Sequence, residues 1–243
     1  LSAAWPPRVS TTWIRDFALG LKAMQERHFI YLLGGDTVAT PGPICLSVTA
    51  FGLVKKGKAV RRSGARPGDL LYVTGTLGDA ALGLRLLMGE DCGHLSNDLQ
   101  SDLIARYQQP QPRTTCSELV RKHATSAIDV SDGLVADVAH LASASKVQIV
   151  IRRSSIPLST AARQVIANDH GQVNHVWGGG DDYELAFTAP RGSQVDKQIL
   201  ESSDVPVTEI GEVIMADGKA GAVTLVDDNG NAIDVDTGGF RHF

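Results

Sequence analysis

The stretch Ala127–Leu134, Ala-Ile-Asp-Val-Ser-Asp-Gly-Leu, places two carboxylates and a hydroxyl where a buried strand is expected to run into a helix. The strand is predicted over Thr125–Asp129, and the apolar spacing of Gly133–Ser145 predicts an amphipathic helix. Strand-to-helix turns of α/β folds bind ligands, because the amides of the helix N-terminus point outward there. Asp132 could instead cap the helix, which is the commonest use of Asp before an apolar periodic run. The stretch therefore leaves a structural and a functional interpretation open.

Two further acidic turns have a similar composition. Gly34–Thr37 is Gly-Gly-Asp-Thr and Gly178–Asp182 is Gly-Gly-Gly-Asp-Asp, and each adjoins an apolar segment. Glycines let a backbone approach a ligand closely and expose N–H groups to anions. Carboxylates beside them would repel a phosphate unless a cation lies between, and Mg²⁺ binds both carboxylates and phosphates. Each turn alone is more often a cap or a solvated loop, but the three together indicate a Mg²⁺–nucleotide site.

Other motifs that would indicate a different class of site are absent from the sequence. It contains no Gly-x-x-x-x-Gly-Lys-Ser/Thr loop, no Gly-x-Gly-x-x-Gly after a strand, no Gly-x-Ser-x-Gly and no His-Glu-x-x-His. These absences argue against P-loop, dinucleotide-binding, α/β-hydrolase and zinc-hydrolase sites. The formal net charge of -4 gives no indication of a nucleic-acid or membrane partner.

The cysteines and the apolar runs indicate in which cellular compartment the protein is expected. Cys45, Cys92 and Cys116 are odd in number and form no Cys-x-x-Cys pair, which argues against a disulfide framework and favours a reducing, cytoplasmic setting. No apolar run approaches the roughly 20 residues that a membrane span needs. The start of the chain has no signal-peptide pattern and no initiator Met, so we expect it to begin inside a longer protein.

The first part of the chain predicts a small α+β layer. Trp13–Arg27 has helical apolar spacing, and Phe29–Leu33 and Ile44–Val54 are predicted as antiparallel strands because no helix separates them. Lys55–Arg66 is basic and punctuated by glycines, which suits either a domain linker or a solvated loop.

The remainder of the chain alternates predicted strands and helices in the manner of an α/β domain. The strands are predicted over residues 70–74, 125–129, 147–151, 183–188, 207–213 and 222–226. The helices are predicted over residues 80–88, 98–108, 117–123, 133–145, 160–168 and 194–201.

Taken with their intervals, the acidic turns resemble those of the thiamine-monophosphate kinase family, part of the aminoimidazole ribonucleotide synthetase-like superfamily. The matching segments follow the family's order over nearly the whole chain: Leu33–Thr37, Arg62–Asp69, Val73–Ala81, Ile128–Leu134, Gly179–Leu185, Ile210–Val213 and Gly239–Phe243. The resemblance implies a two-domain fold of the α+β and α/β classes, with an incomplete N-terminal α/β domain over residues 1–60 and a C-terminal α/β domain over residues 61–243.

The resemblance also implies a reaction and the residues that serve it. The expected activity is ATP-dependent phosphorylation of thiamine monophosphate to thiamine diphosphate by in-line transfer. Asp129 and Asp132 would be catalytic, and the residues expected to bind Mg²⁺ are Asp36, Asp129 and Asp132. The residues expected to bind ATP are Gly35, Asp36, Arg62 and Ser131, and Asp36 would do so through the bound metal. Glu184 would face the thiamine part of the substrate, and Phe240 would stack near its ring. The family further implies a homodimer.

The chain departs from the family pattern in ways that keep alternatives open. Family members begin with roughly 80 further residues, compatible with ordinary domain sizes, that hold more metal aspartates. Phe240 stands where the family usually has Trp or Tyr before the C-terminal His-Phe. The alternatives are another ATP-dependent synthetase of the superfamily, of the purine-pathway or selenophosphate type, and a non-catalytic nucleotide-binding relative.

Overall fold

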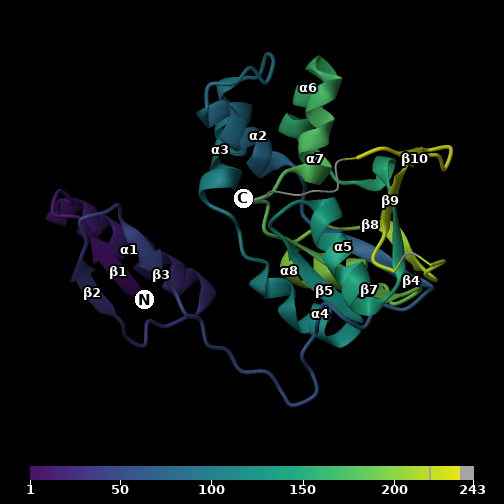
Figure 1. The fold of residues 1–243 in the computed structure, drawn as a ribbon, viewed down its shortest axis with the longest axis horizontal. Coiled ribbons are helices and arrows are strands. Elements are labelled where there is room, and N and C mark those ends of the chain that lie inside the picture. The colour runs from purple at the N-terminus through teal and green to yellow at the C-terminus, as the bar shows by residue number, and fades with distance from the viewer. Residues whose placement is uncertain (219, 236–243) are drawn as a thin grey trace. The chain divides into compact units, whose positions relative to one another are not determined.

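The computed structural model describes residues 1–218 and 220–235, and these form two compact units that divide between Lys56 and Gly57 (Figure 1). We describe each unit by itself. The sequence-based boundary lay between residues 60 and 61. No helix in the described part of the chain is both long and apolar enough to cross a membrane.

The first unit is a three-stranded sheet with one helix. Strand β1 (Ser2–Trp5) lies in the middle, parallel to β2 (Asp36–Ala39) and antiparallel to β3 (Cys45–Ser47). Helix α1 (Thr11–His28) begins at Ser10, whose hydroxyl accepts a hydrogen bond from the Trp13 N–H.

The strand expected over Phe29–Leu33 is wrong, and so is its antiparallel pairing with Ile44–Val54. Phe29 adopts a left-handed conformation (φ 54°) that ends α1. The amide of Ile30 and that of Leu32 are then bonded to the backbone oxygen and the side-chain oxygen of Gln25, at 3.1 and 2.7 Å. Because these amides are bonded to a helix end, they are not available to a sheet ladder. The predicted long second strand is reduced to β3.

The second unit contains a mixed sheet with the order β10-β9-β6-β8-β4-β7-β5 among its described residues (Figure 1). All neighbouring strands in it are antiparallel except β6 and β9. The strands are β4 (Asp69–Thr74), β5 (Ser126–Val130), β6 (Gln148–Arg152), β7 (Glu184–Pro190), β8 (Val207–Ile214), β9 (Val223–Val226) and β10 (Ala232–Ile233). The helices are α2 (Asp79–Leu87), α3 (Asn97–Gln108), α4 (Ser117–His123), α5 (Leu134–Ser145), α6 (Thr160–Asn168), α7 (Asn174–Gly178) and α8 (Val195–Ser203).

The side chains of the buried strand β4 alternate between two apolar clusters, one on each face of the sheet. Leu71 and Val73 pack in a cluster with the apolar face of α5, whereas Leu70 and Tyr72 pack in a second cluster with α4 and α8. Successive side chains of a strand point to opposite faces, so the sheet separates two helical layers. Helices α2, α3 and α6 gather around a third apolar cluster (Figure 1). The site described below lies where β5 and β7 meet α5 and α2.

Candidate functional site

The turn between β5 and α5 presents its acids to solvent. Asp129 and Asp132 are exposed and Ser131 is half-buried, whereas Val130 between them is buried. Helix α5 has Gly133 as its N-cap (φ 122°) and no side-chain capping bond. The interpretation of Asp132 as a helix cap is therefore wrong. Among the described residues, neither carboxylate of the pair takes part in a hydrogen bond or ion pair, so the oxygens of both are available to a ligand.

A buried acid of α5 takes the place of the missing cap. The Oδ2 atom of Asp137 accepts hydrogen bonds from the backbone N–H groups of Ser131 and Asp132, each at 2.9 Å. Asp137 is 3% exposed. Burial, with a smaller contribution from the nearby carboxylates of Asp132 and Asp129, raises the pKa of Asp137 although the two amides oppose that shift. The carboxylate of Asp137 thus holds the turn in place through the amides of Ser131 and Asp132.

The structure brings the Gly178–Asp182 turn against this one. The Asp181 N–H donates to the Ser131 carbonyl at 2.9 Å, and the Tyr183 N–H donates to the Val130 carbonyl at 2.8 Å. A Cβ atom at Gly180 would lie 2.3 Å from the Ser131 oxygen, so only glycine allows this approach. Two of the three acidic turns therefore converge.

The converging turn has a strained backbone. Asp181 and Tyr183 both have positive φ, 69° and 51°. A bulky side chain rarely adopts this region, and such outliers cluster at functional sites. Tyr183 is 42% exposed, and partial burial, followed by the charges of Asp181, Asp129 and Asp132, raises its pKa. The phenol therefore lies close to the same group of carboxylates.

Beneath the exposed acids lie two that are fully buried. Asp182 accepts bonds from the amides of Gly78 and Ala80 at the start of α2, at 2.6 and 3.1 Å. Burial raises the pKa of Asp182 to about 7. Glu184 is 0% exposed and accepts bonds from the Thr74 hydroxyl at 2.6 Å and from Arg106 Nη2 at 2.9 Å.

Glu184 also binds a second arginine. Arg113 Nε donates to Glu184 Oε2 at 2.6 Å, and Arg113 Nη2 pairs with Oε1. This hydrogen-bonded ion pair raises the pKa of Arg113. Because its described hydrogen-bond partners are two cationic groups and a hydroxyl, the carboxylate of Glu184 is compensated despite its burial.

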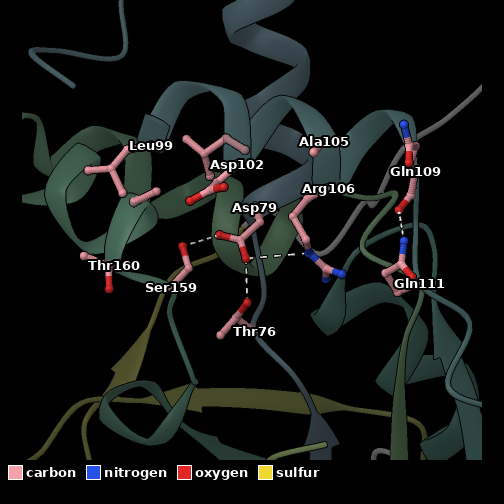
Figure 2. Close-up of a pocket in the computed structure, with 12 residues that line it drawn as sticks. Thr76, Asp79, Leu99, Asp102, Ala105, Arg106, Gln109, Gln111, Ser159 and Thr160 are labelled. Atoms are coloured by element: carbon pink, nitrogen blue, oxygen red, sulfur yellow. Dashed lines mark hydrogen bonds and ion pairs between the residues drawn. The ribbon is translucent and has the colours of Figure 1, made fainter. Parts of the chain in front are cut away.

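A cavity of about 510 Å³ lies on the other side of Arg106 (Figure 2). Its size is typical of a small-molecule site. Asp79 is one of the residues that line it and accepts hydrogen bonds from the hydroxyls of Thr76 and Ser159 at 2.5 and 2.6 Å, with Arg106 Nε 3.8 Å away. Arg106 therefore connects the cavity wall to Glu184. The other residues that line the cavity are Leu99, Asp102, Leu103, Ala105, Gln109, Gln111, Thr160 and Ala161.

Three of the other predicted site residues lie away from this turn or are not placed relative to it. Gly35 and Asp36 belong to the first unit, where a Cβ at Gly35 would meet the Leu1 carbonyl and Asp36 accepts the Thr37 amide at 2.8 Å. Arg62 is exposed, and its carbonyl accepts the Ser145 hydroxyl at 3.1 Å.

The adjacent Arg61 carbonyl accepts the Ala127 amide at 3.0 Å, so this basic segment runs along the first half of β5. Phe240 lies outside the described residues. Among the described residues, no three His, Cys, Asp or Glu side chains gather closely enough to hold a metal ion by themselves. A site here would need ligand phosphates or water to complete it, which is how Mg²⁺ is commonly held.

Sequence reasoning missed three residues that shape the site: Arg106, Arg113 and Asp137. Asp137 gave a signal, since an acid in the first turn of a helix whose N-cap is Gly has amides to bond. The arginines gave none, because each lies more than 70 positions from Glu184 in the chain.

The comparisons with known proteins agree with this architecture. Residues 66–223 match the family model described as AIR synthase related protein, C-terminal domain. The chain is 37% identical over 222 residues to the thiamine-monophosphate kinase of Caulobacter vibrioides, an alignment that covers 90% of this chain and 62% of that protein. The chain thus spans less than two thirds of this relative's length.

Solved structures give the same result. The thiamine-monophosphate kinase of Stenotrophomonas maltophilia superposes with a TM-score of 0.82 at 39% identity, over 96% of this chain and 72% of that one. AaThiL complexed with AMPPCP and TMP superposes with a TM-score of 0.79 at 27% identity, over 100% and 72%. These similarities confirm the fold class expected from the sequence.

Proposed function

The chain belongs to the thiamine-monophosphate kinase family, and from this premise we propose that the intact protein phosphorylates thiamine monophosphate with ATP. The observation that carries the proposal is the pair of exposed, unbonded carboxylates, Asp129 and Asp132, on a turn fixed by Asp137 and Asp181. A fixed pair of hard oxygen ligands suits Mg²⁺ shared with phosphates. The solved relative that binds both AMPPCP and TMP supports the choice of substrates.

The reaction requires charge compensation more than a nucleophilic side chain. A phosphate oxygen of thiamine monophosphate attacks the γ-phosphorus of ATP, the new P–O bond forms as the bond to the β-phosphate oxygen breaks, and ADP leaves. Both reactants are anions, and two unit charges 4 Å apart cost about 4 kcal/mol at an effective dielectric near 20. Phosphoryl transfer is catalysed by positioning and by stabilisation of this charge. Mg²⁺ supplies that compensation when bound.

We assign the binding residues on the same premise. In the second unit, Asp129 and Asp132 are assigned as metal ligands, and Ser131 and Arg62 as contacts of ATP. Asp36 and Gly35, which belong to the first unit, are assigned to the metal and to ATP, respectively, from the family resemblance alone. The exposure of Arg62 and its position along β5 support a role as a fork for phosphate oxygens.

The thiamine end of the substrate is assigned to the cavity beside Arg106. Glu184 is buried, so in our proposal it supports the substrate through Arg106, which lines the cavity, rather than by direct contact. The family resemblance implies that Phe240, which lies outside the described residues, contacts the ring of the substrate. We also propose that the protein acts as a cytoplasmic homodimer, the state that the family implies.

The test is a product assay on the intact protein. ATP, MgCl₂ and thiamine monophosphate are supplied, and thiamine diphosphate and ADP are quantified by chromatography. The proposal expects equal amounts of both products. Consumption of ATP only with a purine-pathway substrate, or only with selenide (which gives selenophosphate, AMP and inorganic phosphate), would assign the protein to another synthetase of the superfamily. Binding of ATP without any turnover would assign it to a non-catalytic nucleotide-binding relative.

A further inference from the structure

The conformation of the Asp129–Gly133 turn depends on one buried side chain. Asp137 accepts the N–H groups of both Ser131 and Asp132 on a single oxygen, and its own N–H donates to the Gly133 carbonyl at 3.0 Å. The last of these is the ordinary i to i−4 bond of a helix, so the two bonds to the side chain are what this residue adds to the loop. Resting on the function proposed above, we propose that Asp137 is a positioning residue for phosphoryl transfer, which holds the turn so that Asp129 and Asp132 face the ligand.

The turn has few other means of support. Its N-cap, Gly133, has no side chain, and the two amides that Asp137 accepts have no other described hydrogen-bond acceptor. From the opposite side, the Asp181 amide bonds the carbonyl of Ser131. Ser131 is thus held by its N–H from one element and by its carbonyl from another, and removal of Asp137 would release one of these two restraints.

Asp137 cannot perform this role by touching a ligand. It is 3% exposed and packs on the inner face of α5. Its carboxyl group is also close enough to Asp132 and Asp129 to interact with them electrostatically. A neutral replacement that still accepts hydrogen bonds separates these two contributions, because Asn keeps an acceptor oxygen and loses the charge.

A second buried acid of the same unit provides a matched control. Asp69 is 5% exposed and accepts the Arg66 amide at 2.9 Å and the Thr125 hydroxyl at 2.7 Å. It lies at the start of β4, away from the acidic turns. A purely structural role for buried acids would give Asp69 and Asp137 variants the same behaviour.

The experiment compares Asp137→Ala, Asp137→Asn and Asp69→Asn in the intact protein, with three measurements. These are the free energy of unfolding, amide hydrogen exchange of the segment 129–133, and kcat and KM for ATP. Misplacing a catalytic group by about 1 Å costs roughly a hundredfold in rate. We therefore expect Asp137→Ala to lower kcat about a hundredfold and to accelerate exchange at residues 131 and 132. Asp137→Asn should restore most of the protection from exchange and part of kcat, whereas Asp69→Asn should keep wild-type kcat and wild-type exchange at the turn.

Two results would overturn the proposal. One is a folded Asp137→Ala protein whose kcat stays within about threefold of wild type. The other, which decides the matter if that variant does not fold, is an Asp137→Asn protein with unprotected amides at 131 and 132 and wild-type kcat. If the wild-type protein makes no thiamine diphosphate, the proposed function fails. The exchange data then still show whether Asp137 holds the turn, so the two failures are distinguishable.

Discussion

The second unit contains two groups of acids that differ in exposure. The exposed pair, Asp129 and Asp132, has no described hydrogen-bond or ion-pair partner, whereas each buried acid, Asp137, Asp182 or Glu184, accepts at least two hydrogen bonds. Exposed and buried acids lie close together in the chain: Asp129 and Asp132 are exposed, and Asp137, five residues later, is buried. Residue type and local sequence therefore do not decide which acid is available to a ligand.

The buried acids hold in place the backbone and the arginines around the turn that carries the exposed pair. Asp182 bonds the first amides of α2, Glu184 anchors Arg106 and Arg113, and Asp137 holds the turn itself. Burying a carboxylate is costly unless hydrogen bonds or opposite charges compensate it. Variants of the buried acids should therefore change stability most, and variants of the exposed pair should change activity most.

The largest effect on stability is expected for Glu184→Ala. The substitution leaves Arg106 and Arg113, each less than one fifth exposed, without their shared partner. Breaking a buried ion pair by removing one member typically costs about 3–5 kcal/mol. Chemical denaturation of the intact protein measures this loss as a change in the free energy of unfolding.

An exposed pair of the same chemistry gives the control. Glu209 pairs with Arg152 at 2.7 Å, and both side chains are about 40% exposed. Surface pairs contribute only about 0–1 kcal/mol, so Glu209→Ala should be nearly neutral. Equal losses for the two variants would remove the distinction between buried and exposed acids.

The next effect is a pH dependence that Asp182 causes. Its pKa is raised from 3.8 to about 7 in the folded protein, so between these values the folded state holds a proton that the unfolded state has released. The stability that this group contributes is therefore complete below about pH 4 and is lost as the pH rises through about 7. Asp182→Asn should remove this dependence, and the difference between the wild-type and variant unfolding free energies should change by roughly a few kcal/mol over that window. A difference that is constant from pH 4 to 7.5 would contradict the raised pKa.

The smallest effect concerns the backbone strain at Tyr183. Asn tolerates positive φ better than Tyr, so Tyr183→Asn should stabilise the protein by up to about 1 kcal/mol, despite some lost contact area. Tyr183→Phe keeps the strain and should not stabilise it. Thermal unfolding of the two variants side by side makes the comparison, and a clear destabilisation by Asn alone would show that the side chain matters more than the strain.

Much of the second unit could be predicted from the sequence. Apolar spacing located β4 through β9 and most of the helices, because their cores are continuous and their ends carry Gly, Pro or Ser signals. The secondary structure of the first unit was predicted less well. The apolar run Phe29–Leu33 has the composition of a strand, but the amides of Ile30 and Leu32 are bonded to Gln25. The central strand β1 has only four residues and carried no pattern.

The candidate site was predicted only in part, for a physical reason. The residue types and glycines of the turns at Asp129 and Gly178 are local features, and they predicted two turns that the structure brings together. Which acids are buried depends on partners far away in the chain, such as Arg106 for Glu184. The Gly34–Thr37 turn belongs to the first unit, whereas the other two turns belong to the second. Its convergence with them therefore stays a prediction.

In the proposed function, Asp129 and Asp132 bind the metal that the reaction needs and do not support the fold. Asp132→Asn in the intact protein tests this assignment most directly, with thiamine diphosphate formation and the free energy of unfolding measured on the same preparation. Losing a group that stabilises transition-state charge costs about 100-fold or more in kcat, whereas exposed substitutions change stability by about 0.5 kcal/mol or less. We expect a folded, nearly inactive protein. A folded variant that keeps kcat within a few-fold of wild type would contradict it.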